Sequence, residues 1–318
     1  MIQTGILGKT QIPVTRLGVG TLTMSPMQRG LSVEEGADVL LAAFEGGVRF
    51  VDTAQMYKSQ PQVGAALAKW QGPRITITSK SAASTAVAME NALDDARRQT
   101  GLDVIDGFLL HIVRDAADFE ARRPALDVLL KAKAEGRIRA IGASSHFVST
   151  IEFLSRQPEV EILHPMLNKG GFGILDAPLD RMLAILADAH ARGVGIYAMK
   201  PLGGGHLRHE AEAALRWVLE RPEIDAIAVG MTSPDEVRMN LAIARGETVS
   251  EDMLKRVESH PRRLFLNSAL CKKCGACVEN CDQKAITKQG DKYVIDHERC
   301  VLCGYCAPRC PGFALRVI

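Results

Sequence analysis

The stretch CKKCGACVENC, residues 271–281, decides how this chain is organised. It holds the first four of the eight cysteines, and the other four follow in CVLCGYCAPRC, residues 300–310. Both stretches have the spacing C-x2-C-x2-C-x3-C, which wraps thiolates around a compact cube of iron and sulfur. The two stretches therefore predict two [4Fe–4S] clusters near the carboxyl end of the chain.

In doubled runs of this kind, the fourth cysteine of each run serves the other cluster. One predicted ligand set is Cys271, Cys274, Cys277 and Cys310, and the other is Cys300, Cys303, Cys306 and Cys281. Disulfides are disfavoured because the sequence shows no secretory signal. Zinc is disfavoured because it would use these cysteines as pairs rather than as two runs of four.

Residues 269–318 resemble a bacterial two-cluster ferredoxin. Between the cysteine runs, KAITKQGDKYVID (284–296) predicts two short strands that turn at Gly290 and Asp291. Asp282 follows the first run, where these ferredoxins often have proline. The resemblance implies a small α+β domain over residues 269–318, joined to the rest of the chain by a linker over residues 261–268.

Residues 1–260 alternate short β-branched runs with amphipathic helical stretches, after a predicted hairpin over residues 4–16. Eight strands are expected, over residues 16–21, 48–53, 74–80, 105–113, 137–144, 160–167, 194–200 and 225–230. Most of these runs do not alternate polar with apolar residues, which is typical of parallel strands buried on both faces. The predicted fold is α/β, a (β/α)8 TIM barrel.

Composition excludes several classes of function. The 318 residues are 47% hydrophobic, which is enough for a large domain and a small one. The 39 basic and 37 acidic residues nearly balance, so nothing indicates a nucleic-acid partner. No run of 18 apolar residues and no signal-peptide pattern occurs. We therefore expect a soluble cytoplasmic protein without a membrane partner.

In barrels of this type, chemistry gathers where the strands end. Asp52 and Tyr57 follow the second strand in FVDTAQMY, Lys80 ends the third and His111 ends the fourth. With LGVGT, IGASSH and KPLGGG, these residues make the region up to about residue 250 resemble the aldo-keto reductases. The resemblance implies that Tyr57 is the general acid and that His111 orients the carbonyl. It also implies that Asp52 and Lys80 lower the pKa of Tyr57 from its usual value of about 10.

The resemblance further implies a nicotinamide cofactor. Its carboxamide would meet Ser144, Ser145, His146 and Asn168, with His164 where many members have glutamine and Met199 where many have an aromatic ring. After the last strand, VGMTSPDEVRMN (229–240) would hold the adenosine end, through Gly230, Thr232, Ser233 and Asn240. Gly230 and Glu236 stand where members that prefer NADP have basic residues. NAD(H) is therefore slightly favoured over NADP(H), and absence of any nicotinamide remains open.

The main hypothesis is an iron–sulfur oxidoreductase that reduces a small carbonyl substrate or oxidises an alcohol. Its clusters would pass electrons, with an external ferredoxin or another redox protein as a possible partner, and one cluster would lie beside the barrel mouth. Nicotinamide moves two electrons and each cluster moves one, and no flavin motif is present to divide the pair. Two alternatives stay open: an electron-transfer or docking protein on an inactive barrel, and a nicotinamide-dependent reductase whose clusters are purely structural.

Overall fold

Eight parallel strands close into a barrel in the computed structural model, which describes residues 1–258, 262–312 and 314–317. The strands are β3 (Leu17–Gly20), β4 (Phe50–Asp52), β5 (Thr76–Ser81), β6 (Ile105–Leu110), β7 (Ile138–Ser145), β8 (Ile162–Pro165), β9 (Gly195–Met199) and β10 (Ala226–Gly230). Neighbouring strands follow chain order, and β10 pairs with β3 to complete the ring. The predicted (β/α)8 barrel is confirmed.

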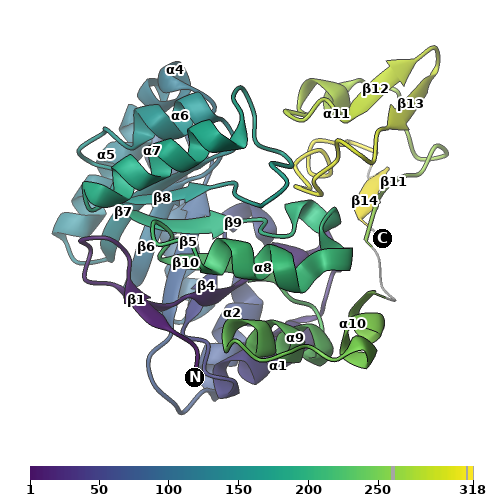
Figure 1. Ribbon diagram of the computed structural model, residues 1–318. Helices are drawn as coiled ribbons and strands as arrows, with labels where there is room; N and C mark the ends of the chain where they lie inside the picture. The colour runs from purple at the N-terminus through teal and green to yellow at the C-terminus, as the bar shows by residue number, and fades with distance from the viewer. Residues whose placement is uncertain (259–261, 313, 318) are drawn as a thin grey trace.

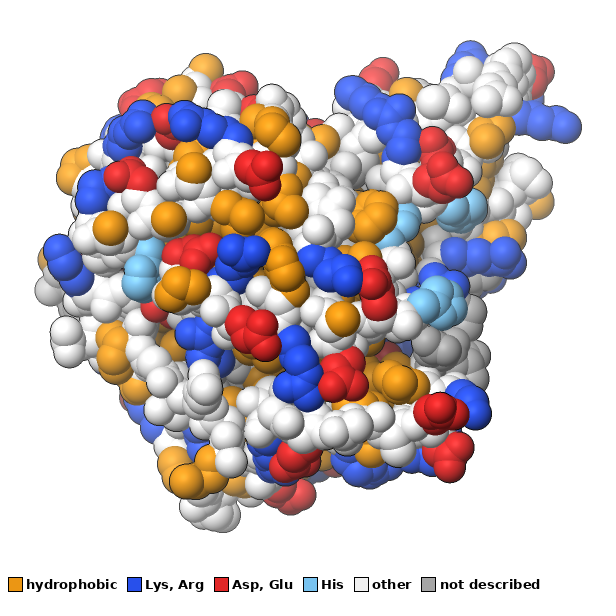
Figure 2. Space-filling model, in the orientation of Figure 1, with side chains coloured by type: hydrophobic (Ala, Val, Ile, Leu, Met, Phe, Trp, Pro, Cys, Tyr) orange, Lys and Arg blue, Asp and Glu red, His pale blue; other side chains and the backbone are white. Residues whose placement is uncertain are grey.

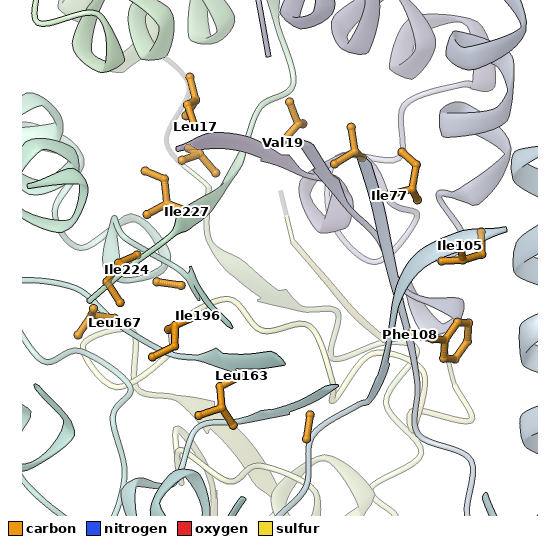
Figure 3. Packing of buried hydrophobic residues seen from close by; sticks show 14 of the residues in the cluster. Leu17, Val19, Ile77, Ile105, Phe108, Leu163, Leu167, Ile196, Ile224 and Ile227 are labelled. Atoms are coloured by element: carbon orange, nitrogen blue, oxygen red, sulfur yellow. The ribbon is translucent and has the colours of Figure 1, made fainter. Parts of the chain in front are cut away.

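Helices surround the barrel on the outside (Figure 1). They are α1 (Val33–Glu45), α2 (Gln60–Lys69), α3 (Ala86–Thr100), α4 (Ala116–Ala121), α5 (Arg123–Ala134), α6 (Val148–Leu154), α7 (Leu179–Ala191), α8 (Ala211–Leu219), α9 (Pro234–Ala244) and α10 (Glu251–Glu258). The main core lies between helices and strands, where residues such as Leu17, Ile77 and Phe108 are fully buried (Figure 3). Each strand has helices on one side and the barrel interior on the other, so both of its faces are buried. This explains why the strands appear in the sequence as continuous apolar runs. No helix among the described residues is long and apolar enough to cross a membrane.

A hairpin closes the amino-terminal end of the barrel. Strands β1 (Thr4–Ile6) and β2 (Pro13–Thr15) are antiparallel, as predicted. Between and beside them, Leu7, Ile12 and Val14 are buried in a second core with Phe50 and Tyr197 from the barrel interior. Because this end is plugged by apolar side chains, polar chemistry is confined to the opposite end, where the strands finish.

The cysteine-bearing region forms a small module with its own strands. Helix α11 (Ala276–Glu279) lies within the first cysteine run, and β12 (Ile286–Gln289) pairs with β13 (Lys292–Ile295) in the predicted hairpin. The expected linker needs correction, because Leu264–Leu266 forms β11 and pairs with β14 (Leu315–Val317). The module thus begins before residue 269, while residues 259–261 at the predicted boundary lie outside the described residues.

The module packs against the loops at the carboxyl ends of the barrel strands (Figure 1). The Gln28 amide donates to the carbonyl of Leu302 at 2.8 Å, and the Gln283 amide donates to the carbonyl of Gly173 at 2.9 Å. Gly204 has φ +72°, and a β-carbon there would lie 2.3 Å from the carbonyl oxygen of Val301. Glycine is therefore needed where the two parts approach, both for its backbone conformation and for space.

Candidate active site

Four polar residues from consecutive strand ends meet at the barrel mouth, as the sequence predicts. Asp52 ends β4, and Tyr57 lies in the short 3₁₀-helix Gln55–Tyr57 that follows it. Lys80 lies in β5, and its ammonium nitrogen is 2.6 Å from both carboxylate oxygens of Asp52. His111 directly follows β6, with its Nε2 atom 3.4 Å from the hydroxyl of Tyr57. All four residues are buried.

The Asp52 carboxylate is held by several donors. Burial alone would raise its pKa, but the Lys80 ammonium, followed by His164, outweighs that effect, so the pKa of Asp52 is lowered. Thr78 donates its hydroxyl to Oδ1 at 3.0 Å, and Tyr197 donates to the same atom at 2.8 Å. Asp52 therefore stays ionised and fixes the position of Lys80, whose ammonium lies 5.1 Å from the centre of the Tyr57 ring.

The acidity of Tyr57 differs from the prediction. Its pKa is raised well above the usual value, first by burial and then by the nearby Tyr305 and Asp52. The expected lowering is therefore wrong for this arrangement. The physical reason is that the Lys80 ammonium is paired with Asp52, while the buried phenol has lost the water that would stabilise its ionised form. In this environment Tyr57 keeps its proton and is available as a donor.

His111 is a neutral ring. Burial lowers its pKa well below the usual value, and the charge of Lys80 adds to the effect. Its Nδ1 atom has no hydrogen-bond partner among the described residues. With Nε2 directed at Tyr57, the second nitrogen is left for a polar group other than those of the described residues.

Tyr197 escaped the sequence analysis of the barrel, and His164 was assigned there to a different contact. Tyr197 in β9 reaches across the interior to Asp52, and the ring of His164 stacks on the Tyr197 ring with centroids 4.0 Å apart. His164 was expected near a nicotinamide, but its Nε2 atom lies 3.8 Å from Asp52 Oδ2. The inward position of Tyr197 on its strand is the signal that would have revealed it.

A second missed residue comes from the small module. Tyr305 lies between two predicted cluster ligands, Cys303 and Cys306, yet its ring projects into the barrel mouth. The ring meets His111 edge-on, with centroids 5.9 Å apart, and lies parallel to His146 with centroids 5.8 Å apart. An aromatic residue inside a cysteine run was visible in the sequence, but its approach to residues far earlier in the chain was not.

A cavity extends from this site along the mouth of the barrel. It begins at Asp52, Tyr57 and His164, and Leu302 and Tyr305 of the module line it as well. It continues past Met199 and Lys200 to Gly230, Glu236 and Arg262. Met199 and Gly230 line this cavity, and the module forms part of its wall.

Several predicted cofactor contacts are already used inside the protein. The Ser144 hydroxyl accepts from the backbone of Ile112 at 2.9 Å, and the Ser145 hydroxyl donates to Val113 at 2.7 Å. Asn168 bonds twice to the backbone of Phe172, at 2.9 Å each. These three side chains hold loops in place, so their expected role as direct carboxamide contacts is not supported by the geometry.

His146 and Asn240 differ from that group. Burial lowers the pKa of His146 to about 3, so its ring is neutral. Its Nε2 atom and the Oδ1 atom of Asn240 are buried and have no hydrogen-bond partner within the described residues. Buried polar atoms are normally paired, so each calls for a ligand atom. The resemblance assigns His146 to the carboxamide and Asn240 to the adenine, and their unpaired atoms fit a nicotinamide dinucleotide in that role.

The loop after β10 is organised around Glu236. Ser233 caps α9 by accepting from the backbone of Glu236 at 3.2 Å, and the Thr232 hydroxyl donates to the Glu236 carboxylate at 3.0 Å. Arg262, which follows the barrel, pairs with the same carboxylate at 2.7 Å. Thr232 and Ser233 are thus occupied by the cap and its neighbour, and Arg262 brings a cation to this end of the cavity that the sequence analysis did not anticipate.

Apart from Cys274, the cysteines have neighbours of the kind that the two predicted ligand sets require. Burial raises the pKa of Cys277, and the neighbouring thiols that add to the effect are Cys271 and Cys310. Burial likewise raises the pKa of Cys306, with Cys303, Cys300 and Cys281 as its neighbours. In both groups, cysteines of one run lie beside the last cysteine of the other run, as the predicted ligand sets require.

The donor set also fits iron–sulfur chemistry. Backbone N–H groups of Ala285 and Ala314 donate to the sulfurs of Cys281 and Cys310, each at 3.3 Å. No group of three metal-binding side chains among the described residues converges on a single ion. A four-iron cube takes one thiolate on each iron, as two sets of four cysteines would provide.

Comparison with known proteins agrees with this geometry. The sequence model of the aldo/keto reductase family matches residues 16–212, and that of the 4Fe-4S dicluster domain matches residues 270–314. An aldo-keto reductase of Mycolicibacterium vanbaalenii is 28% identical over 258 residues, covering 76% of this chain and 86% of that protein. L-galactose dehydrogenase of Arabidopsis thaliana is 21% identical, covering 76% and 88%.

Solved structures have the same fold. A putative aldo-keto reductase from Pseudomonas aeruginosa superimposes with a TM-score of 0.64 at 25% identity, covering 76% of this chain and 94% of that one. The family match covers more than half of the chain and includes Asp52, Tyr57, Lys80 and His111. The chain therefore belongs to the aldo/keto reductase family, as an oxidoreductase that carries a 4Fe-4S dicluster domain at its carboxyl end.

Proposed function

We propose that this protein reduces a small carbonyl compound, or oxidises the corresponding alcohol, at the barrel mouth with Tyr57 as the proton donor or acceptor. The observation that carries the proposal is the contact of Tyr57 with His111 at 3.4 Å, beside the Lys80–Asp52 pair and at the wall of the cavity. A barrel that served only as a scaffold and catalysed no reaction would not need a buried ion pair beside a buried phenol.

Each residue has a separate role in this proposal. The substrate oxygen lies between the Tyr57 hydroxyl and His111, which orients it through a neutral ring nitrogen. Tyr57 gives its proton to that oxygen as negative charge develops. Lys80 stabilises the resulting phenolate, and Asp52 keeps Lys80 in position. The nicotinamide, when bound, supplies a hydride to the carbonyl carbon.

The module gives the site a second source of electrons. Each [4Fe–4S] cluster, when bound, gives or takes one electron. Cys303 and Cys306 flank Tyr305, whose ring touches His111, so the second ligand set lies nearest to the site. Cys274 of the first set is exposed. We propose that the first set would hold the cluster that exchanges electrons at the protein surface, and that the second set would hold the cluster that exchanges them at the barrel mouth.

One observation favours a second candidate. Leu302 and Tyr305 line the cavity, which is what a lid would do whether or not its clusters changed oxidation state. A nicotinamide-dependent reductase with structural clusters would need the same contacts. The two candidates differ in whether reduced clusters alone can reduce a carbonyl.

The test is turnover of the cluster-loaded protein with methylglyoxal as the probe carbonyl and either a nicotinamide or a reduced ferredoxin as donor. Tyr57→Phe should lower kcat by roughly 10²–10⁴-fold, the range for loss of a general acid. Tyr293→Phe removes a phenol hydroxyl from the module instead and should leave turnover unchanged. If Tyr57→Phe turns over like the parent protein, another group handles the proton and the proposal fails.

A further inference from the structure

The surface around the first cysteine run carries several basic side chains. Residues 269–318 contain eight Lys and Arg against five Asp and Glu. Figure 2 shows several Lys and Arg side chains on the small module beside the barrel. One of the acidic residues, Asp282, is turned toward the barrel and pairs with Arg114 at 3.3 Å. The outward side of the module is therefore basic.

Four residues of this surface are neighbours in the sequence. Leu270 is 51% exposed, and Lys272, Lys273 and Cys274 are exposed as well. A β-carbon on Gly312 would lie 2.3 Å from the carbonyl oxygen of Leu270, so the chain after the second run supports this stretch from behind. An exposed leucine next to an exposed cluster ligand, with lysines around them, resembles the centre and rim of a transient protein interface.

The β12–β13 hairpin adds a further lysine. The Tyr293 hydroxyl donates to the backbone carbonyl of Lys273 at 3.1 Å. Lys288 is paired directly with Tyr293, and directly paired residues share a face of the hairpin. Lys288 is therefore on the face that turns toward Lys273, whereas Lys292 is on the other face, because neighbouring residues alternate.

Acidic residues near this surface offset its charge only in part. Asp291 lies 3.3 Å from the Lys273 ammonium, but both side chains are well exposed, so the pair is weak. Glu279 is the other carboxylate at this side, at the end of α11. Lys272 and Lys288 have no ion-pair partner among the described residues.

We infer that Leu270, Lys272, Lys273, Cys274 and Lys288 form the docking face for an acidic protein that carries a one-electron group. The inference rests on the proposed function, because it assumes that the clusters change oxidation state. One electron leaves the reduced carrier and enters the cluster held by Cys271, Cys274, Cys277 and Cys310, and the carrier leaves oxidised by one electron. Positive charge around the exposed ligand steers an acidic carrier to the point of shortest transfer.

The test measures cluster reduction and needs no carbonyl substrate, so failure of the inference can be told apart from failure of carbonyl reduction at the barrel mouth. The cluster-loaded protein is mixed with reduced flavodoxin, an acidic one-electron carrier, and loss of the cluster absorbance is followed by stopped flow. At low salt, Lys272→Glu with Lys273→Glu should slow reduction by about tenfold or more, since steering changes association rates by 10–10³. Added salt should remove most of the difference.

Matched control variants separate an effect of the docking face from an effect of net charge. Lys292→Glu, on the other face of the hairpin, with Lys69→Glu on barrel helix α2 makes the same change in net charge away from the face and should slow the reaction by less than about threefold. Iron content and reduction by dithionite should be equal in all variants. With basic cytochrome c as the acceptor from reduced clusters, the face variant should react faster than the parent protein. The inference would be overturned if both double variants slowed cluster reduction equally, or if the rate did not depend on salt concentration.

Discussion

The barrel and the module differ in what holds them together. The barrel has a continuous core, and its reactive residues Asp52, Lys80 and His111 are buried in it. Among the described residues, the module's core cluster has six buried side chains, and four of the nine partly buried residues packed around it are cysteines. Regions this small usually need a metal or disulfides for stability. The difference teaches that the barrel can form its site alone, whereas the module depends on what its cysteines bind.

Removal of the iron tests this difference between barrel and module most strongly. Chelation under reducing conditions should unfold residues 264–317 and leave the barrel folded, because metal binding and folding are one process in such domains. Hydrogen exchange would show protection lost in β11–β14 and retained in β3–β10. Unchanged protection of the module without iron would mean that its own packing suffices.

A second prediction concerns the barrel alone. Lys80→Met should destabilise the protein by about 3–5 kcal/mol, because it leaves the buried carboxylate of Asp52 without its cation. Lys69→Met is the matched control, since Lys69 pairs with Asp38 at 3.8 Å on the surface and should matter by less than about 1 kcal/mol. Urea unfolding of both variants measures the difference. Equal loss of stability in the two would show that the buried pair has no special role.

The third prediction sharpens the boundary between the regions. Tyr305→Leu should raise KM for methylglyoxal by about 10–200-fold with kcat nearly unchanged, as expected when a pocket wall loses contact with substrate. Tyr305→Phe keeps the ring and should restore most of the affinity. Iron content must be equal in the two variants. A fall in kcat with KM unchanged would mean that Tyr305 acts on the reaction step instead of on binding.

Much of the barrel site could be predicted because its residues stand at strand ends. The positions of Asp52, Lys80 and His111 follow from the order of the strands, and parallel strands bring their ends together. Tyr305 and Arg262 could not be found in this way, because each reaches the cavity only through the packing of the module and of the segment before it. Ser144 and Ser145 were misjudged for a related reason: sequence shows a hydroxyl but not the backbone group it already serves.

The smallest expected effect concerns the choice of nicotinamide. Glu236 lies at the far end of the cavity, and its carboxylate should repel a 2′-phosphate, while Arg262 pairs with it and limits that repulsion. We expect NADH to bind a few times more tightly than NADPH. Glu236→Gln should reverse the order by freeing Arg262 to meet the phosphate. Fluorescence titration of both cofactors measures this, and preference for NADPH in the parent protein would contradict it.

The central claim is that the module and the barrel share one reaction, and a single-turnover experiment tests it most directly. The clusters are reduced, the reductant is removed, and methylglyoxal is added without oxygen or nicotinamide. Two electrons and two protons convert the carbonyl to an alcohol, so the account predicts that both clusters reoxidise as one equivalent of alcohol forms. The same reduced clusters should stay reduced in Tyr57→Phe. Clusters that stay reduced in the parent protein, while NADH supports normal turnover, would contradict the account.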